Sequence, residues 1–183
     1  MKRSLTRLLR ILFILIIRLI DGYTKAKILK KLAYFNTQGD NCYFASSNFG
    51  TEPYLVSLGD NVYFAAGVRL VTHDMSAKVV QDISGIKGLH KFGHIKIGSN
   101  VFIGLDAIVM PGIIICNDVI VSAGAIVSKN INESGVYAGI PAKKIMDMDA
   151  YVDKIIILNA SYPWRNNNKS PTKADLIEYF FGE

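Results

Sequence analysis

A period of six residues runs through the middle of the chain. In blocks of six, residues 97–132 read IGSNVF, IGLDAI, VMPGII, ICNDVI, VSAGAI and VSKNIN, and residues 58–75 read LGDNVY, FAAGVR and LVTHDM. The first position of every block is apolar, the second is mostly small, and the fifth is apolar except at Asp74. This period fits neither an α-helix, with about 3.6 residues per turn, nor one long alternating strand.

Short strands joined by regular corners satisfy this period. If three blocks form one triangular coil, stacked coils bury a continuous apolar column that no coil could bury alone. We therefore predict a mainly β protein, a parallel β-helix of about four to five coils. Cys42 and Cys116 fall on the repeat frame and are interpreted as packing residues.

The repeat is interrupted once. Residues 75–94, MSAKVVQDISGIKGLHKFGH, keep no rhythm before the repeat resumes at Ile97. We predict a loop excursion here, with little helix before residue 97 apart from the N-terminal segment. Long excursions from solenoids are often functional, and a break in a local rule, as at Asp74, marks either function or the end of a coil.

Composition narrows the class of protein. Half of the 183 residues are hydrophobic and a fifth are charged, which suits one main domain with a sizeable core. Two cysteines are too few for a disulfide framework and form no zinc pattern. The formal net charge of +6 suits a phosphate-rich ligand or an anionic surface, but the basic residues are not interleaved with aromatics, so no nucleic acid is expected.

The N-terminal segment, residues 1–34, predicts an amphipathic basic helix with arginines opposite leucines. Its apolar run, residues 11–17, is too short to span a bilayer, and no small-residue cleavage site follows, so neither a span nor a signal peptide is expected. Residues 1–31 are therefore expected either to contact the inner face of the cytoplasmic membrane peripherally or to pack on the core or on a partner subunit. Both alternatives stay open.

The stretch IGSNVFIGLDAIVMPGIIICNDVIVSAGAIVSKNI, followed by VYAGIPAKKI, resembles the hexapeptide-repeat acyltransferases, which fold as left-handed parallel β-helices. The likeness covers about residues 38–145, and the left-handed coiling is implied by it alone. It implies a β-helix domain over residues 35–145 and a homotrimer with active sites at subunit boundaries. Residues 146–183 are expected to form a C-terminal helical extension, in which SPTKADLIEYFF predicts a helix with Ser170 as N-cap.

LGDNV from residue 58 and THD at 72–74 are similar to the pattern of galactoside and maltose acetyltransferases. The resemblance implies that His73 is the general base, and a neutral imidazole suits the removal of a hydroxyl proton near pH 7. Asp74 either orients His73 or turns the chain outward, since adjacent strand side chains point to opposite faces. His90 and His94 are candidates for the acceptor site or are solvated loop residues.

The resemblance also implies a binding groove for acetyl-coenzyme A, in which lysines serve as point charges for phosphate. The residues assigned to it are Ala123, Gly124, Ser128, Lys129, Lys143 and Lys144. No metal is expected. The acidic and aromatic N-terminal region of the galactoside and maltose enzymes is missing here, so the better likeness is to short acetyltransferases of capsule, O-antigen and exopolysaccharide synthesis. The implied function is cytoplasmic O-acetylation of a sugar in a surface polysaccharide or in its lipid-linked or nucleotide-sugar precursor.

Two alternatives come from other classes. One is a metalloenzyme similar to the γ-class carbonic anhydrases, which bind zinc with three histidines; Gly93 between His90 and His94 disfavours a helix that would present both to one metal. The other is a non-catalytic β-helix that serves as an assembly module.

Overall fold

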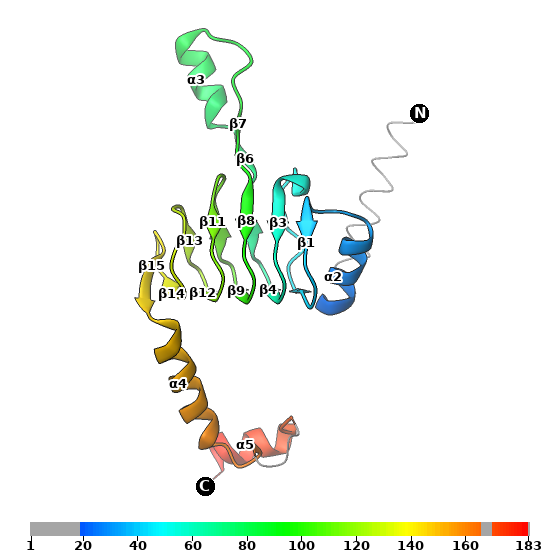
Figure 1. The fold of residues 1–183 in the computed structure, drawn as a ribbon, viewed down its shortest axis with the longest axis vertical. Helices are drawn as coiled ribbons and strands as arrows, with labels where there is room; N and C mark the ends of the chain where they lie inside the picture. Colours follow the sequence, from blue (N-terminus) through cyan, green and yellow to red (C-terminus); the bar gives the residue numbers. More distant parts are fainter. Residues whose placement is uncertain (1–18, 166–169, 183) are drawn as a thin grey trace. The chain divides into compact units, whose positions relative to one another are not determined.

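The computed structural model describes residues 19–165 and 170–182 (Figure 1). The predicted amphipathic helix falls largely on residues 1–18 and so lies outside the described residues. The chain divides into two compact units, Met1–Met148 and Asp149–Glu183, and each is described by itself.

Three parallel sheets form the walls of a β-helix (Figure 1). The first contains, in spatial order, β1 (Thr37–Gln38), β3 (Val56–Leu58), β8 (Ile95–Ile97) and β11 (Ile114–Ile115). The second contains β2 (Tyr43–Phe44), β4 (Val62–Phe64), β9 (Val101–Ile103), β12 (Val119–Val121) and β14 (Gly135–Ala138), with β15 (Lys143–Met146) antiparallel at its edge. The third contains β5 (Arg69–Leu70), β10 (Ile108–Val109) and β13 (Ile126–Val127). The predicted β-helix with flanking helices is confirmed.

The six-residue frame determines which side chains enter the core. Every first position from Leu58 to Val127 is buried, and so is every fifth position apart from Asp74. The second position is small because coils stack at strand spacing: a Cβ on Gly104 would lie 2.5 Å from the backbone nitrogen of Ala123. Burial raises the pKa of the Cys42 and Cys116 thiols, which agrees with their interpretation as packing residues.

The fourth position forms the corners of the coils. Most fourth positions have a positive φ, which Gly, Asn and Asp adopt with least strain. They are Asn61, Gly67, Asn100, Asp106, Gly112, Asp118 and Gly124. His73 occupies a fourth position without a positive φ, and there the chain leaves the coil.

Helix α2 (Gly22–Lys31) packs on the first coil, where the rings of Phe35, Phe44 and Phe49 fill the end of the column. The side chain of Lys25 is 2% exposed, and its amine donates to the carbonyl oxygens of Ala45 and Ser46 and to the Ser47 hydroxyl. Burial lowers the pKa of Lys25. The described end of the N-terminal segment therefore covers the core.

Residues 75–94 project from the β-helix, and the prediction of little helix here was wrong (Figure 1). Strand β6 (His73–Asp74) pairs antiparallel with β7 (Lys91–Phe92), and helix α3 (Ser76–Ser84) lies between them. Asp74 accepts a hydrogen bond from the backbone N–H of Ser76, the first residue of the helix, at 2.8 Å. Gly85, with φ of 71°, ends the helix. A short 3-10 helix, η1 (Pro53–Leu55), also precedes residue 97.

The C-terminal unit contains α4 (Met148–Ala160) and α5 (Lys173–Phe181). Thr172, not Ser170, is the N-cap of α5, because Thr172 and Asp175 form a reciprocal capping box. Tyr162, Trp164 and Tyr179 pack their rings together beside it. Within the described ranges, no helix is long and apolar enough to cross a membrane.

Candidate active site

His73 lies where the chain leaves the third sheet, at the base of the excursion. Its Nδ1 is 2.7 Å from Oε2 of Glu52 and 3.0 Å from the Thr51 hydroxyl. Its side chain is 31% exposed, and the ring lies against Phe92 with centroids 5.4 Å apart. The hydrogen bonds of the His73 ring to other described residues are thus made through Nδ1.

Glu52 reaches His73 from the preceding coil. Gly50 has φ of 80° and a Cβ there would lie 2.7 Å from the Thr72 hydroxyl, so the absence of a side chain lets this segment approach Thr72. Oε2 of Glu52 accepts hydrogen bonds from Thr72 at 2.7 Å and from Thr51 at 2.8 Å. Sequence reasoning missed Glu52, which stands immediately before the proline of TEPYL, outside the clear part of the repeat.

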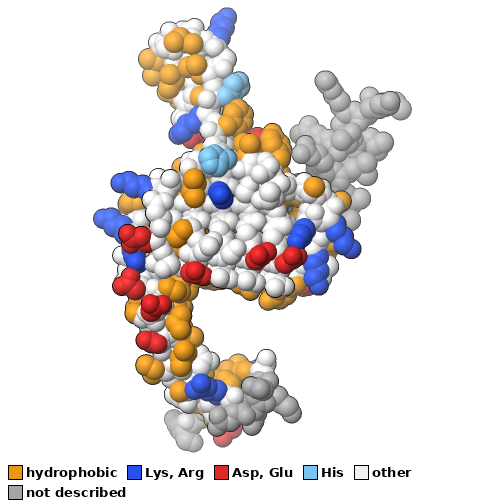
Figure 2. All heavy atoms as spheres, in the orientation of Figure 1, with side chains coloured by type: hydrophobic (Ala, Val, Ile, Leu, Met, Phe, Trp, Pro, Cys, Tyr) orange, Lys and Arg blue, Asp and Glu red, His pale blue; other side chains and the backbone are white. Residues whose placement is uncertain are grey.

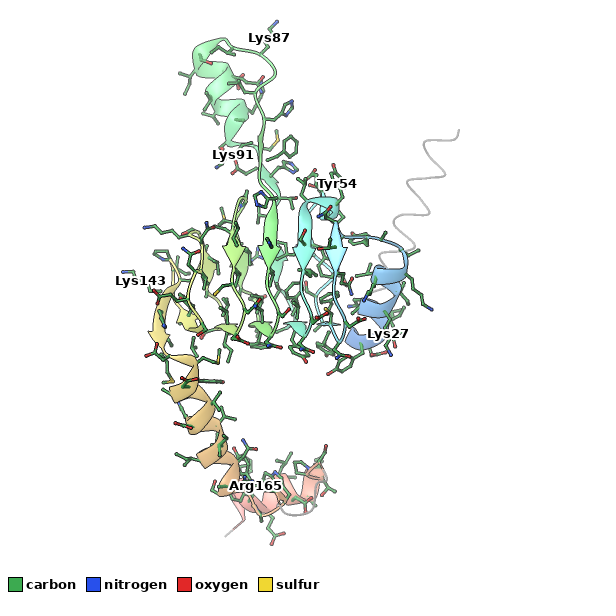
Figure 3. All side chains as sticks on the ribbon, viewed as in Figure 1. Lys27, Tyr54, Lys87, Lys91, Lys143 and Arg165 are labelled. Atoms are coloured by element: carbon green, nitrogen blue, oxygen red, sulfur yellow. The ribbon has the colours of Figure 1, made fainter. Side chains whose placement is uncertain are left out.

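The carboxylate of Asp74 contacts other residues of the excursion. It forms an ion pair with Lys91 at 2.7 Å and accepts hydrogen bonds from the hydroxyl and backbone N–H of Ser76. The hydrogen bond from Lys91, followed by those from Ser76, lowers the pKa of Asp74 to about 2. These contacts tie Asp74 to the excursion, and its role stays a prediction. Figure 3 shows Lys91 at the junction of the excursion with the β-helix.

A hollow of about 190 Å³ lies between the excursion and His73. Its lining includes Glu52, His73, Asp74, His90, Lys91 and Phe92. The ring of His90 stacks on that of Phe92 at 5.7 Å, whereas His94 is exposed and lies outside the lining. Among residues 19–165 and 170–182, no three His, Cys, Asp or Glu side chains are grouped to hold a metal ion.

The residues expected to bind coenzyme A lie on two neighbouring corners and on β15. Ser128 and Lys129 follow β13, so they lie on the corner of His73, two strands further along the third sheet. Ala123 and Gly124 form the corner before β13, and all four are exposed. Lys144 is paired with Asp147 at 2.7 Å and Glu133 at 3.4 Å, and these hydrogen bonds, chiefly that to Asp147, raise its pKa. Lys143 is exposed (Figure 3) and makes no ion pair within the described part of the chain.

Comparison with known proteins identifies the family. A family model described as hexapeptide repeat of succinyl-transferase matches residues 94–129. The protein CapG of Staphylococcus aureus is 39% identical over 132 residues, which cover 70% of this chain and 75% of CapG. The chain belongs to the hexapeptide-repeat acyltransferase family. The predicted family and enzyme class are thereby confirmed.

Other relatives of this acyltransferase agree. The galactoside O-acetyltransferase of Escherichia coli K12 is 33% identical over 98 residues, which cover 54% of this chain and 47% of that enzyme. A solved structure of a galactoside acetyltransferase in complex with coenzyme A superposes with a TM-score of 0.51 and 22% identity, over 71% of this chain and 73% of that one. This structural likeness shows the fold alone.

Proposed function

We propose that this acyltransferase moves an acetyl group from acetyl-coenzyme A to a sugar hydroxyl, with His73 as the general base. The acceptor is a surface polysaccharide or its lipid-linked or nucleotide-sugar precursor. The observation that carries the proposal is the His73 imidazole beside a hollow, with Nδ1 on Glu52. The galactoside O-acetyltransferase among the relatives supports a sugar acceptor.

The transfer requires no covalent enzyme intermediate. As the sugar oxygen attacks the thioester carbonyl carbon, Nε2 of His73 accepts the hydroxyl proton. The C–S bond then breaks, and the imidazolium returns that proton to the departing sulfur. The products are the acetyl ester and free coenzyme A, and His73 is neutral again.

The candidate donor residues support coenzyme A as the carrier. Lys129 and Ser128 share the corner of His73, and strands in the third sheet lie about 5 Å apart. A coenzyme A molecule extended along this corner from His73 therefore reaches Lys129 after about 10 Å. Lys143, without an ion pair in the described residues, supplies a positive charge for phosphate, whereas two carboxylates already balance Lys144.

Replacement of His73 by alanine tests the proposed base. We expect turnover to fall by about 10² to 10⁴-fold, the usual range for loss of a general base, while the affinity for coenzyme A stays the same. Lys154→Ala, an exposed change on α4, serves as control. The assay follows acetylation of candidate glycans by mass spectrometry. Full activity of His73→Ala would exclude this residue as the base.

We also infer the arrangement of the assembly from the family resemblance. The β-helix, residues 35–145, coils left-handedly, and three copies associate with their active sites at subunit boundaries. His90 and His94 contribute to the acceptor side, where His90 already lines the hollow. Light scattering tests the trimer, and an active monomer would refute it.

The enzyme is further proposed to act in the cytoplasm, at the inner face of the membrane, through residues 1–31. The exposed side chains of Lys27, Lys30 and Lys31 on α2 support attraction to anionic lipid, of about 1 kcal/mol per basic residue close to the surface. Co-sedimentation with anionic vesicles should fall as salt rises. Vesicle binding that survives removal of residues 1–31 would contradict this location.

A further inference from the structure

Three hydrogen-bond donors converge on a single oxygen of Glu52. Oε2 lies 2.7 Å from the Thr72 hydroxyl, 2.8 Å from the Thr51 hydroxyl and 2.7 Å from Nδ1 of His73. The Glu52 side chain is 14% exposed and Thr72 is 1% exposed. The carboxylate is thus held from two coils, and the Glu52 side chain is largely removed from solvent.

We propose that Glu52 is the positioning residue of His73: its carboxylate keeps the proton on Nδ1 and leaves the Nε2 lone pair directed to the acceptor hydroxyl. This inference rests on the proposed function. An ionised carboxylate only accepts hydrogen bonds, so at 2.7 Å it requires Nδ1 to be the donor. The neutral ring then has its free lone pair on Nε2, the form that a general base needs.

The surroundings keep Glu52 ionised. Burial alone would raise the pKa of Glu52, but the hydrogen bonds from Thr72, His73 and Thr51 outweigh it and the pKa is lowered. A second effect follows during turnover, because the imidazolium that forms on proton transfer lies beside a negative charge in a partly buried site. The carboxylate stabilises this imidazolium by more than it would in a fully exposed ion pair.

Within the described part of the chain, Glu52 is the one carboxylate in the lining of the hollow that contacts His73. Asp74, its neighbour in sequence, is engaged by Lys91 and Ser76. Lys78 on α3 is paired with Asp82, and His90 lies beyond the Phe92 ring. The pairing of His73 with a carboxylate therefore depends on Glu52.

Glu52→Gln tests the proposal with little change of shape. The glutamine carbonyl oxygen still accepts hydrogen bonds at the position of Oε2, so Glu52→Gln removes the negative charge that stabilises the imidazolium. Glu52→Ala also removes the acceptor that holds the proton on Nδ1. We expect kcat to fall about 10²-fold with an unchanged KM for acetyl-coenzyme A, and the acid limb of the pH–rate profile to move to lower pH. Asp40→Asn is the matched control, since Asp40 forms an exposed ion pair with Lys30 at 2.6 Å.

The tautomer itself is measured by ¹⁵N NMR of the histidine ring. The wild-type protein should carry the proton on Nδ1 of His73, and Glu52→Ala, which removes the acceptor, should lose this preference. A wild-type ring protonated on Nε2 would overturn the proposal, even if the variant failed to fold. So would unaltered kcat and pH profile in a folded Glu52→Gln variant. Failure of the proposed function gives a different result, namely full activity of His73→Ala.

Discussion

Replacement of Gly50 by alanine should destabilise the protein and also slow catalysis. Gly50 has φ of 80°, a conformation that costs a residue with a side chain about 1–2 kcal/mol. The added Cβ would also lie 2.7 Å from the Thr72 hydroxyl and 2.9 Å from the Leu70 carbonyl oxygen. Overpacking of this kind costs about 1–3 kcal/mol, so the free energy of unfolding should fall by about 2–5 kcal/mol.

Gly112→Ala is the matched control. Gly112 has nearly the same φ, 82°, but a Cβ there would meet no atom of the described residues within 4 Å. The backbone strain alone should cost about 1–2 kcal/mol. Unfolding of both variants in urea then separates the strain, which they share, from the crowding, which belongs to Gly50.

The crowding at Gly50 also displaces the segment that carries Glu52. We therefore expect kcat of Gly50→Ala to fall while the KM for acetyl-coenzyme A is kept. Equal losses of stability in the two variants would refute the packing argument. A Gly50→Ala variant that is destabilised as expected but fully active would refute the link between this glycine and His73.

Two further predictions concern the core and the excursion. Phe44→Ala should lower the free energy of unfolding by about 3–5 kcal/mol, because the ring is fully buried among Phe35, Phe49 and Phe64. Phe102→Ala, at a 40% exposed site, should lower it by less than half as much. Similar losses for the two variants in urea unfolding would contradict this. Asp74 has a pKa of about 2 in the fold against its usual 3.8, so its stabilising contribution is present above pH 3.8 and is lost as pH falls toward about 2. The unfolding midpoint of Asp74→Asn should therefore depend less on pH in this window than that of the wild type, and identical pH curves would argue against it.

The β-helix could be predicted because each block repeats the same local requirements. An apolar first position points inward, a small second position allows the next coil to stack, and the fifth position again enters the core. The sequence also carries a signal for the corners, since Gly, Asn or Asp stands at most fourth positions. Handedness has no such local signal, and its expectation rests on family resemblance.

Helix α3 could not be predicted by the same reasoning. Helices are recognised by an apolar face that packs on a core, but α3 has no buried residue in the described chain. Val79, Val80 and Ile83 are all more than half exposed, and Figure 2 shows hydrophobic side chains on the outer part of the excursion. Its C-terminal end is determined by a single residue, Gly85, and the helix is only nine residues long.

Of the candidate site, the sequence indicates His73 but not its partner Glu52. His73 stands out because it occupies a corner position where other blocks have Gly, Asn or Asp, but its partner comes from a coil with a weaker repeat. Two rows of paired residues align the neighbouring coils. Along the third sheet, Asn48 pairs with Arg69, which pairs with Ile108. Along the first sheet, Ser57 pairs with Lys96, which pairs with Ile114.

These pairings show where the first coil departs from the repeat. Asn48 precedes Ser57 by nine positions, whereas Ile108 precedes Ile114 by six, so the corner of the first coil contains three additional residues. Glu52 lies within this longer corner, directly before η1, and the added length lets its carboxylate reach the next coil at His73. A change in repeat length, rather than the acidic residue itself, is therefore the feature of the sequence that indicates a partner for the histidine.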